Sequence, residues 1–384
     1  MRIEKIVPRG LGLAFADGLT VFVALAAAGD VAEIRLTEVK GKTAFAEIES
    51  FVEHSRDRVI PPCPYFGTCG GCDFQQMNYQ AQLKAKVAMI RDCLHRIAKM
   101  EWPSEIPIIP SSAEFGYRLR AQWHCDTNTK RIGYFKRDTR ELVDIDHCIV
   151  LLPELQAKLS EFRSNGDWAM FSNDKVQIDA AVGGNGAVSV ASPDLSQPVD
   201  EIEIELFGEK YTFSARSFFQ GNRFLVDKLI ETALGGAGGK NALDLYCGVG
   251  LFTLPLGRNF ENVIGVEENY EAVEFAKRNA SKAGLANIEF RSDSVRSYLS
   301  NVIESDIDLV LLDPPRAGTE KETIMNVIRL KPTHVSYVAC EPSMLARDLR
   351  RFLDAGFSID SITALDMFPQ THHVETVVHL SRNA

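Results

Sequence analysis

The sequence predicts an α/β protein in which a doubly wound sheet forms the C-terminal part and two β-rich parts precede it. From about Asn241 onwards, strand-like runs alternate with helix-like runs, which is typical of a sheet covered by helices on both faces. Residues 1–57 and about 105–212 instead contain short alternating runs separated by glycines and charges. We therefore expect three domains, at residues 1–57, 58–212 and 213–384.

The composition indicates a globular protein of the cytoplasm without membrane contact. Of 384 residues, 45% are hydrophobic and 24% are charged, and no run of about 18 apolar residues predicts a transmembrane helix. The opening "MRIEKIVPRG" lacks the apolar segment of a signal peptide. A formal net charge of −10 argues against a uniformly basic surface, although a local basic face would still allow nucleic-acid binding. Eight cysteines without an export signal indicate metal binding or catalysis rather than disulfides.

Residues 1–57 predict a small β-domain, because short alternating runs are separated there by glycines and charges. Five short strands of this size suit an OB-like barrel, a fold that often holds oligonucleotides. A β-barrel without any ligand fits the same pattern equally well.

Three closely spaced cysteines follow, in "PPCPYFGTCGGCDFQQ". Cys63, Cys69 and Cys72 have the spacing C-x5-C-x2-C, and Cys148 in "DIDHC" is a distant fourth. Four thiolates fit either an iron–sulfur cluster or zinc. Paired C-x2-C knuckles would favour zinc, whereas three close ligands and one remote ligand suit a four-iron cluster. A helix is expected next, over residues 78–100, and it could pack on the C-terminal domain. We interpret three further cysteines as buried or incidental: Cys93, Cys125 and Cys247.

The turn in "DLYCGVG" predicts a cofactor site at the end of the first strand of the C-terminal domain. Gly248 and Gly250 lack a Cβ and let a ligand approach the backbone, although a G-x-G turn alone is a weak signal. Glu267 ends the next strand, where an acid can accept hydrogen bonds from both hydroxyls of a ribose. The missing third glycine favours S-adenosylmethionine over NAD, because S-adenosylmethionine has no pyrophosphate to hold. Asp293, after the third strand, could bind the adenine amino group.

Two further strand ends carry reactive side chains. In "LLDPPR", Asp313 closes the fourth strand at the switch point of the sheet, and two prolines stiffen the loop that follows. A proline turn with a solvated aspartate is the alternative. In "VACEPSMLA", Cys340 ends a strand immediately before a helix. A lone cysteine is usually a small buried hydrophobic residue, so its role depends on the rest of the chain.

Five motifs, taken together and in this order, resemble those of the RNA uracil-5 methyltransferases: "SFFQGN", "LDLYCGVGLFTLPL", "LLDPPRAG", "ACEPSMLARDL" and "FPQTHHVETVVHL". The resemblance extends to the cysteine-rich loop and to "GYFKRDTRELVDIDHC", and residues 1–57 look like the TRAM domain of many members. It thus covers nearly the whole chain. It is greatest for the ribosomal RNA branch, because the transfer RNA enzyme typical of enterobacteria lacks the TRAM domain and the cluster.

The resemblance implies that a methyl group passes from S-adenosylmethionine to carbon 5 of a uridine in RNA, above all in large-subunit ribosomal RNA. It implies a covalent cysteine–uracil adduct, with Cys340 as the nucleophile and Glu375 as the base. It also implies a [4Fe-4S] cluster on the four cysteines named above. The implied contacts to S-adenosylmethionine are Gln220, Tyr246, Glu267, Asp293 and Asp313. Two positions depart from the family pattern, since Leu251 and Glu341 stand where asparagine is common.

The implied chemistry explains why both a thiol and a carboxylate are needed. Carbon 5 of uracil is too weak a nucleophile to take a methyl group from a sulfonium, but a thiolate added to carbon 6 makes carbon 5 electron-rich. We therefore expect a lowered pKa for Cys340, with help from the N-terminus of the helix that follows it. Glu375 would then remove the proton from carbon 5. For His372 and His373 an orienting or packing role is expected.

Reaching carbon 6 requires an unpaired or flipped base, so RNA should contact the protein locally. Phe218 and Phe219 could stack on this base or could pack in the core. Tyr117–Gln122 and Tyr134–Arg140 combine basic and aromatic residues and are candidates for RNA contacts, with a solvated strand face as the alternative. Three other functions stay open: uracil-5 methylation of transfer RNA, amino-group methylation of a nucleobase, and a non-enzymatic iron–sulfur RNA-binding module. We expect a monomer.

Overall fold

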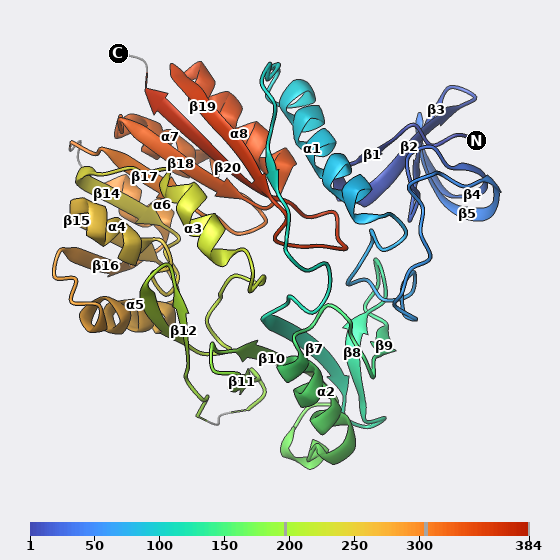
Figure 1. Cartoon of the computed structure of the whole chain (residues 1–384), viewed down its shortest axis with the longest axis horizontal. Coiled ribbons are helices and arrows are strands. Elements are labelled where there is room, and N and C mark those ends of the chain that lie inside the picture. Colours follow the sequence, from blue (N-terminus) through green and yellow to red (C-terminus); the bar gives the residue numbers. More distant parts are fainter. Residues whose placement is uncertain (196–197, 303–305, 383–384) are drawn as a thin grey trace.

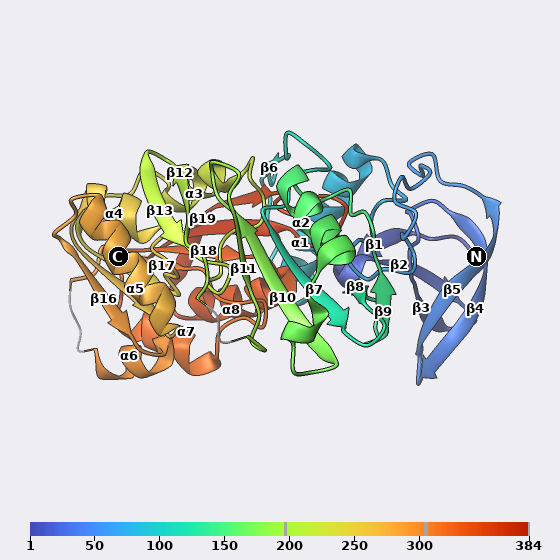
Figure 2. The same ribbon diagram turned by 90° about the horizontal axis from the view of Figure 1, so that it is seen from below.

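The computed structural model describes residues 1–195, 198–302 and 306–382, which form four sheets (Figure 1). An N-terminal sheet lies at one end of the long axis and the largest sheet lies at the other, with a central sheet between them (Figure 2). None of the helices in the described ranges is long and apolar enough to cross a membrane.

The largest sheet has eight strands and contains most of the predicted site residues. In spatial order its strands are β16 (Ile288–Ser292), β15 (Phe260–Glu267), β14 (Gly239–Leu245), β17 (Leu309–Leu312), β18 (His334–Ala339), β20 (Glu375–Arg382), β19 (Phe357–Leu365) and β6 (Ile108–Ile109). The first five run parallel to one another, and β20 is antiparallel to both of its neighbours. The α/β prediction is therefore confirmed, with a mixed sheet.

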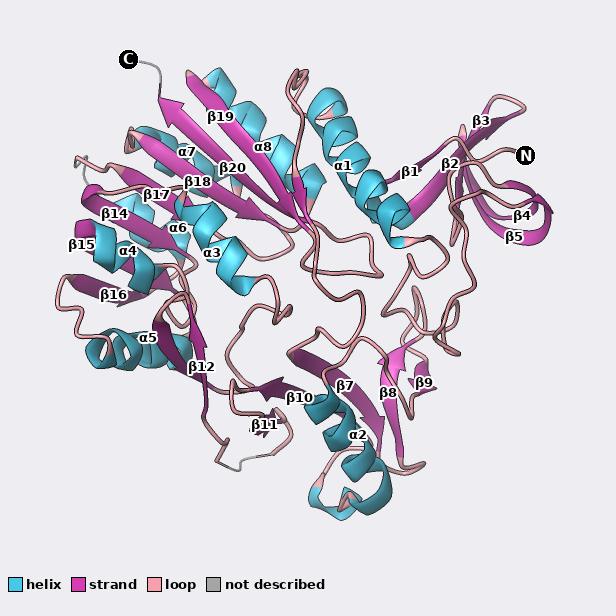
Figure 3. Ribbon diagram, viewed as in Figure 1, coloured by secondary structure: helices cyan, strands magenta, loops and turns pink. Residues whose placement is uncertain are grey.

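Helices cover both faces of this sheet (Figure 3). Side chains of α3 (Val226–Leu234), α4 (Thr253–Asn259) and α5 (Tyr270–Lys282) belong to one hydrophobic cluster, and those of α6 (Val295–Asn301), α7 (Lys321–Arg329) and α8 (Pro342–Asp354) belong to another. This separation places the two groups on opposite faces, as expected for a doubly wound fold.

The sequence of α8 shows why a helix begins directly after Cys340. Pro342 occupies the first turn, where its missing N–H costs nothing. The Glu341 carboxylate caps the helix by accepting from the backbone N–H of Ser343 at 3.4 Å and from its hydroxyl at 2.8 Å. Leu345 and Leu349 are spaced by one helical turn and are both buried. Glu341, which departs from the family pattern, thus has a structural role at the helix start.

The N-terminal part contains the five predicted strands, in the spatial order β1-β2-β3-β5-β4. Their bounds are β1 (Lys5–Val7), β2 (Leu11–Ala16), β3 (Leu19–Val23), β4 (Val31–Lys40) and β5 (Thr43–Glu53), and a short 3-10 turn, η1 (Pro8–Gly10), joins β1 to β2. The OB-like barrel stays a prediction: in the described residues the two edges meet through the bridge of Arg2 with Val31 and through backbone hydrogen bonds, which include Ala32 N–H to the Met1 carbonyl at 2.9 Å.

A five-stranded antiparallel sheet forms the middle of the molecule, in the order β11-β10-β7-β8-β9. Its strands are β7 (Arg120–Asp126), β8 (Arg131–Phe135), β9 (Leu142–Asp144), β10 (Lys175–Val182) and β11 (Val188–Ala191), with α2 (Pro153–Asn165) and the 3-10 turn η2 (Trp168–Met170) beside them. A separate hairpin of β12 (Ile202–Leu206) and β13 (Glu209–Phe213) packs on α5.

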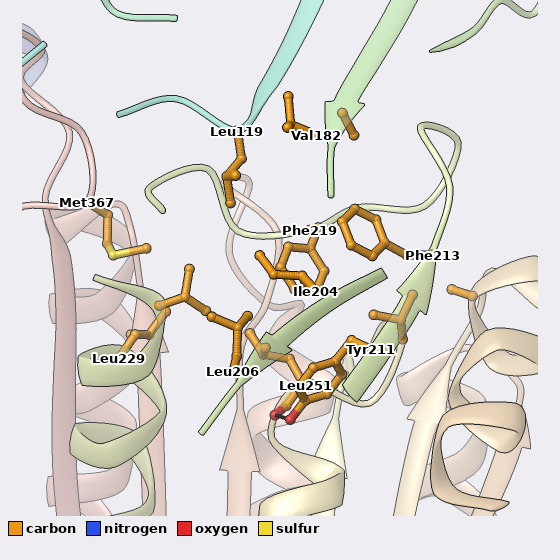
Figure 4. Close-up of a cluster of buried hydrophobic side chains, with 14 of the residues drawn as sticks. Leu119, Val182, Ile204, Leu206, Tyr211, Phe213, Phe219, Leu229, Leu251 and Met367 are labelled. Carbon is orange, nitrogen blue, oxygen red and sulfur yellow. Dashed lines mark hydrogen bonds between the residues drawn. The ribbon is translucent and has the colours of Figure 1, made fainter. Parts of the chain in front are cut away.

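One hydrophobic cluster joins the central sheet, the hairpin and the large sheet (Figure 4). It contains Leu119 and Val182 from the central part, Tyr211 from the hairpin, and Leu229 and Leu251 from the C-terminal part. The Tyr211 hydroxyl also donates to the carbonyl of Leu251 at 3.0 Å. Since buried apolar packing fixes relative positions strongly, the segment between β13 and α3 is held rigidly at the large sheet.

Helix α1 (Tyr79–Arg96) connects the N-terminal sheet to the large sheet, because it packs on both β1 and α8. Lys86 of this helix is fully buried and forms an ion pair with the fully buried Asp366, which follows β19. The Lys86 ammonium also donates to the carbonyl of Phe368 at 3.0 Å. The segment that leads into β20 is therefore held by α1.

Replacing Lys86 with methionine is expected to lower the free energy of unfolding by about 3–5 kcal/mol, because it leaves the Asp366 carboxylate buried without its partner. Chemical denaturation measures this change. Lys84→Met on the same helix removes an exposed lysine and is the matched control. Similar unfolding free energies for the two variants would contradict the role given to the buried pair.

Candidate active site

Strand register brings Asp313, Cys340 and Glu375 to one edge of the large sheet. Asp313 follows β17 and Cys340 follows β18, so both lie at carboxyl ends of parallel strands. Glu375 begins β20, which runs the opposite way and therefore starts at this same edge. Because Ala339 pairs with Thr376, the next residue along β18 and the previous one along β20 lie beside each other. Cys340 thus faces Glu375.

Asp313 is held by Gln220, the glutamine of "SFFQGN". The Gln220 side-chain amide donates to an Asp313 carboxylate oxygen at 3.2 Å, and Gln220 is itself only 4% exposed. Phe219 fixes this loop by stacking on Phe213 with ring centroids 4.3 Å apart. Burial, and then the nearby Asp244 carboxylate, raise the pKa of Asp313 to about 7.

The other predicted cofactor residues follow along the same edge. The Glu267 carboxylate accepts from the backbone N–H of Gly248 at 3.2 Å and from that of Asn269 at 2.8 Å. Asp293 comes after β16, and its backbone N–H donates to the carbonyl of Glu267 at 3.1 Å. Tyr246 has a φ of 68° and Gly248 a φ of 53°, so the loop after β14 turns sharply beside them. The predicted residues thus form a row across four neighbouring strands. Leu251 does not join it, because its side chain packs in the core.

The expectation of a lowered pKa for Cys340 is wrong for the free protein. Burial raises the pKa of the Cys340 thiol to about 12, and the carboxyl groups of Glu375, Asp313 and Glu341 add to this rise. Only Arg316 acts in the opposite direction among the neighbours that shift this thiol most. The helix start beyond Cys340 could be predicted from the sequence, but the number of acids that tertiary packing gathers around the sulfur could not.

Glu375 is 3% exposed, and burial followed by the Asp313 carboxylate raises its pKa well above the usual range. A carboxyl group in such surroundings is a stronger base once ionised. Arg316 partly offsets this rise. Its guanidinium carbon lies 6.0 Å from the centre of the Phe368 ring, so it stands over the segment that leads into β20. Sequence reasoning missed Arg316, although it closes the "DPPR" motif.

The two histidines before β20 have different surroundings. His372 Nδ1 is hydrogen-bonded to the Asp73 carboxylate at 2.5 Å, which ties the site to the cysteine-rich loop. Burial and then the neighbouring His372 lower the pKa of His373 to about 2, so its imidazole is neutral. The buried His373 Nδ1 has no hydrogen-bond partner within the described part of the chain. The orienting role predicted for the pair fits His372.

A cleft of about 840 Å³ leads to this site and is lined by the N-terminal sheet, the cysteine-rich loop, the central sheet and the segment before β20. Two aromatic pairs line it: Phe22 with Phe45 on the N-terminal sheet, at 5.6 Å between ring centres, and His124 with Phe135 on the central sheet, at 3.8 Å. Its cationic lining residues are Arg9, Arg118, Lys136, Arg137 and Arg316, and its acidic ones are Glu47, Asp73 and Asp138. Cations thus outnumber acids here, although the whole chain is acidic.

The two stretches predicted to contact RNA differ in their position relative to this cleft. Tyr134–Arg140 lines the cleft over most of its length. Within Tyr117–Gln122, two side chains instead turn inward. The Tyr117 hydroxyl donates to the carbonyl of Pro369 at 2.9 Å. The Arg120 guanidinium donates to backbone carbonyls, among them that of Ala215 at 2.8 Å. These hydrogen bonds use the stretch mainly to hold the fold together.

Phe218 and Phe219, the two residues predicted to stack on a base, differ in their exposure. Phe219 belongs to the core, as its stacking on Phe213 shows, whereas Phe218 is 70% exposed. The Arg120 guanidinium lies 5.8 Å from the centre of the Phe218 ring. Phe218 alone is therefore available for contact with a ligand.

The four cysteines predicted as cluster ligands are free thiols that line the cleft together. Burial raises the pKa of Cys69, and the thiols of Cys148 and Cys63 raise it further. Cys148, which is distant in sequence, therefore lies close to the cysteine-rich loop. Burial also raises the pKa of Cys72 to about 12. In the described ranges, no three His, Cys, Asp or Glu side chains converge closely enough to hold a metal ion. By donor chemistry four thiols suit either an iron–sulfur cluster or a zinc ion.

Comparisons with known proteins place this site in a family. The family described as tRNA (uracil-5-)-methyltransferase matches residues 199–383. The "23S rRNA (uracil(1939)-C(5))-methyltransferase RlmD" of Shewanella amazonensis is 31% identical, over 98% of this chain and 94% of that protein. The chain belongs to the RNA uracil-5 methyltransferase family. An RNA methyltransferase of Synechocystis is also 31% identical, over 99% of this chain and 95% of its own length.

A solved structure agrees with the family assignment over almost the whole fold. The tRNA (uracil-54, C5)-methyltransferase of Pyrococcus abyssi, in complex with S-adenosyl-L-homocysteine, is 28% identical, has a TM-score of 0.74 and covers 99% of each chain. The S-adenosylmethionine-dependent methyltransferase fold predicted from the sequence is thereby confirmed. Within this family fold, Asp313, Cys340 and Glu375 lie at one edge of the sheet.

The raised pKa of Cys340 predicts slow alkylation of this thiol in the free protein at neutral pH, with a rate that still increases above pH 9. Glu375→Gln removes the neighbouring acid that raises the pKa most, so alkylation at pH 8 should become faster. Each unit of lowered pKa is about a tenfold gain in thiolate. Mass spectrometry of the Cys340 peptide measures the rate, and Glu322→Gln, at an exposed acid, is the control. A titration midpoint below pH 8 for Cys340 would contradict the buried, acid-flanked environment.

Proposed function

We propose that this chain transfers a methyl group from S-adenosylmethionine to carbon 5 of a uridine in 23S ribosomal RNA through a covalent cysteine–uracil adduct. The observation that carries the proposal is the pairing of Cys340 with Glu375 at the sheet edge, next to Asp313 and Gln220. A nucleophile and a base on either side of one base-sized position are what this reaction requires.

The row from Asp293 to Asp313 supports an S-adenosylmethionine site. We assign Glu267 to the ribose hydroxyls and Asp293 to the adenine, because these acids end consecutive strands of the sheet. Tyr246 and Gly248 would lie under the ligand in the sharp turn after β14. Gln220 and Asp313 would bind its amino-acid part, close to Cys340. S-adenosylmethionine supplies a methyl group on a positively charged sulfur, and this charge would favour the ionised form of Asp313.

Each step on the uracil has a residue in a suitable place. The Cys340 thiolate adds to carbon 6. Carbon 5 then takes the methyl group from the sulfonium, and the sulfur–methyl bond breaks to leave S-adenosylhomocysteine. Glu375 removes the remaining proton from carbon 5, after which the carbon–sulfur bond breaks and the Cys340 thiolate is released. Arg316 lowers the pKa of Cys340, so it favours the thiolate that attacks. The raised pKa of Glu375 matches a group that must accept a proton from carbon.

The cleft supports RNA as the substrate. Its cations can contact phosphates, and its two aromatic pairs offer faces on which unpaired bases can stack. The exposed Phe218 is next to the cofactor-binding Gln220, where it could stack on the flipped uracil. We also propose that residues 1–57 act as a TRAM domain that binds RNA, within a chain divided at residues 1–57, 58–212 and 213–384.

Ribosomal RNA is favoured over transfer RNA because the Shewanella relative named for 23S rRNA matches this chain over nearly its full length. Transfer RNA is the second candidate, since the Pyrococcus abyssi enzyme covers the chain equally well. Amino-group methylation of a nucleobase is disfavoured, because it would need neither Cys340 nor Glu375. A non-enzymatic RNA-binding module would leave the same pair without a purpose.

We further propose that Cys63, Cys69, Cys72 and Cys148 hold a [4Fe-4S] cluster. The cluster would cross-link the loop to the central sheet, where it would act structurally or in RNA positioning. Hydrogen bonds hold the backbone at both the central sheet and the loop. The backbone N–H of Cys148 donates to the Gln156 side chain at 2.9 Å, and that of Cys63 donates to the Gln75 side chain at 3.2 Å. The Arg137 guanidinium donates to the carbonyl of Cys72 at 3.1 Å. The cysteines and cleft residues thus belong to one network.

Glu375→Gln should still attack and still transfer the methyl group, because neither step needs a base at carbon 5. It should then stall, since loss of a general base commonly costs about 10²–10⁴ in rate. Denaturing gel electrophoresis should show a protein–RNA species that contains the transferred methyl group. Cys340→Ala should bind RNA and S-adenosylmethionine yet form no such species. Normal turnover by Glu375→Gln, or a stalled adduct without the methyl group, would show that Glu375 is not the base.

Protein purified without oxygen should be brown and contain about four irons per chain. Cys148→Ser should lose most of the iron, because it removes the remote ligand. Cys125→Ser, at a buried cysteine of the central sheet, should retain it. Visible absorption and elemental analysis measure the cluster and the iron content of each variant. Stoichiometric zinc without iron would refute the cluster.

A further inference from the structure

The turn between β1 and β2 of the N-terminal sheet reaches the catalytic thiol. A small cavity beside Cys340 is lined by Pro8 and Arg9 of this turn together with His372 and His373. Arg9 also lines the large cleft. It therefore stands where the cleft meets the site, although it is more than 300 residues away from Cys340 in sequence.

The backbone of this turn is held in an unusual conformation. Arg9 has a φ of 72°, in the left-handed region that side chains with a Cβ rarely adopt. Gly10 also has a φ of 72°, and a Cβ on it would lie 3.0 Å from the Cβ of His372 and 3.1 Å from the Phe74 ring. Strained backbone of this kind persists only where packing holds it, and it concentrates at functional sites.

The packing that holds the turn comes from α1 and from the cysteine-rich loop. Lys5 of β1 forms an ion pair with Asp92 of α1 at 2.5 Å, which fixes the strand that leads into the turn. Gly10 closes the other side by its close approach to Phe74 and His372. The position of Arg9 is therefore set by the catalytic part of the molecule as well as by its own sheet.

The Arg9 side chain is exposed, and no acid or carbonyl within the described ranges pairs with its guanidinium. This contrasts with Arg120 and Arg137, which also lie close to the cleft but donate to backbone carbonyls. Cys340 and Glu341 line the small cavity together with Arg9, and the Glu341 carboxylate would by itself repel an RNA phosphate. A fixed, unpaired guanidinium at this point can bind such a phosphate with two parallel hydrogen bonds.

We propose that Arg9 is a positioning residue that binds a phosphate next to the target uridine and so holds the flipped base over Cys340. The inference rests on the proposed RNA substrate and deepens it. It makes the N-terminal domain part of the active site rather than a remote RNA-binding module. It also explains why an arginine is kept in a backbone conformation that suits glycine.

Salt dependence of RNA binding tests this role directly. For Arg9→Gln, affinity for a fluorescein-labelled oligouridine of about 12 nucleotides should fall about tenfold, the loss typical of a charge-assisted hydrogen bond. The slope of log affinity against log salt should become shallower by about 0.7, the value for one lost contact to a single-stranded phosphate. Arg382→Gln, at an exposed arginine where β20 ends and thus at the far edge of the large sheet from the site, should change neither quantity. Arg9→Lys should keep the slope and lose part of the affinity, because it retains the charge without the paired geometry.

A second variant separates binding from folding. Arg9→Gly relieves the backbone strain, so it should raise the melting temperature while it weakens RNA binding as Arg9→Gln does. Suppose that Arg9→Gln and Arg9→Gly bind RNA with the affinity and the salt slope of the wild-type protein, and that the wild-type protein transfers a methyl group. That result would overturn the role of Arg9 and leave the proposed function standing. If the wild-type protein neither bound RNA nor transferred a methyl group to it, both this inference and the proposed function would be overturned.

Discussion

The antiparallel entry of β20 between β18 and β19 is the constraint on which the site depends. If β20 ran parallel to its neighbours, Glu375 would lie at the far edge of the sheet, away from Cys340. The segment before β20 is accordingly held from several directions: by the Lys86–Asp366 ion pair, by the Tyr117 hydroxyl on Pro369 and by the Asp73–His372 hydrogen bond. Each holding residue comes from outside the C-terminal domain. The upstream parts of the chain thus position the Glu375 carboxyl group.

Burial of acids beside a thiol gives this site its chemical character. Asp313, Glu375 and Cys340 all have raised pKa values because they lie in one water-poor region and oppose one another's negative charge. In the free protein these surroundings therefore disfavour the thiolate form of Cys340. A cationic cofactor and Arg316 would offset this accumulation of negative charge. The arrangement would keep the Cys340 thiol protonated, and so protected from oxidation, until the cofactor is present.

Much of the site could be predicted because its residues follow strands in short, recognisable motifs. Asp313 and Cys340 stand at strand ends, and the structure brings them to one edge, as the α/β pattern indicated. The sign of the Cys340 pKa shift could not be predicted, because it depends on Glu375 arriving from an antiparallel strand and on burial. Arg9 was missed because no local pattern shows that a turn of the N-terminal sheet lies against the catalytic segment.

The central claim is that this chain methylates carbon 5 of a uridine in ribosomal RNA. The most direct measurement incubates the purified protein, S-adenosylmethionine with an isotopically labelled methyl group, and unmodified 23S ribosomal RNA or transfer RNA transcripts. Nuclease digestion and mass spectrometry then identify the labelled nucleoside and its position. The account predicts labelled 5-methyluridine at a single position of the 23S transcript. Label on an exocyclic amino group, or no label in either RNA, would contradict it.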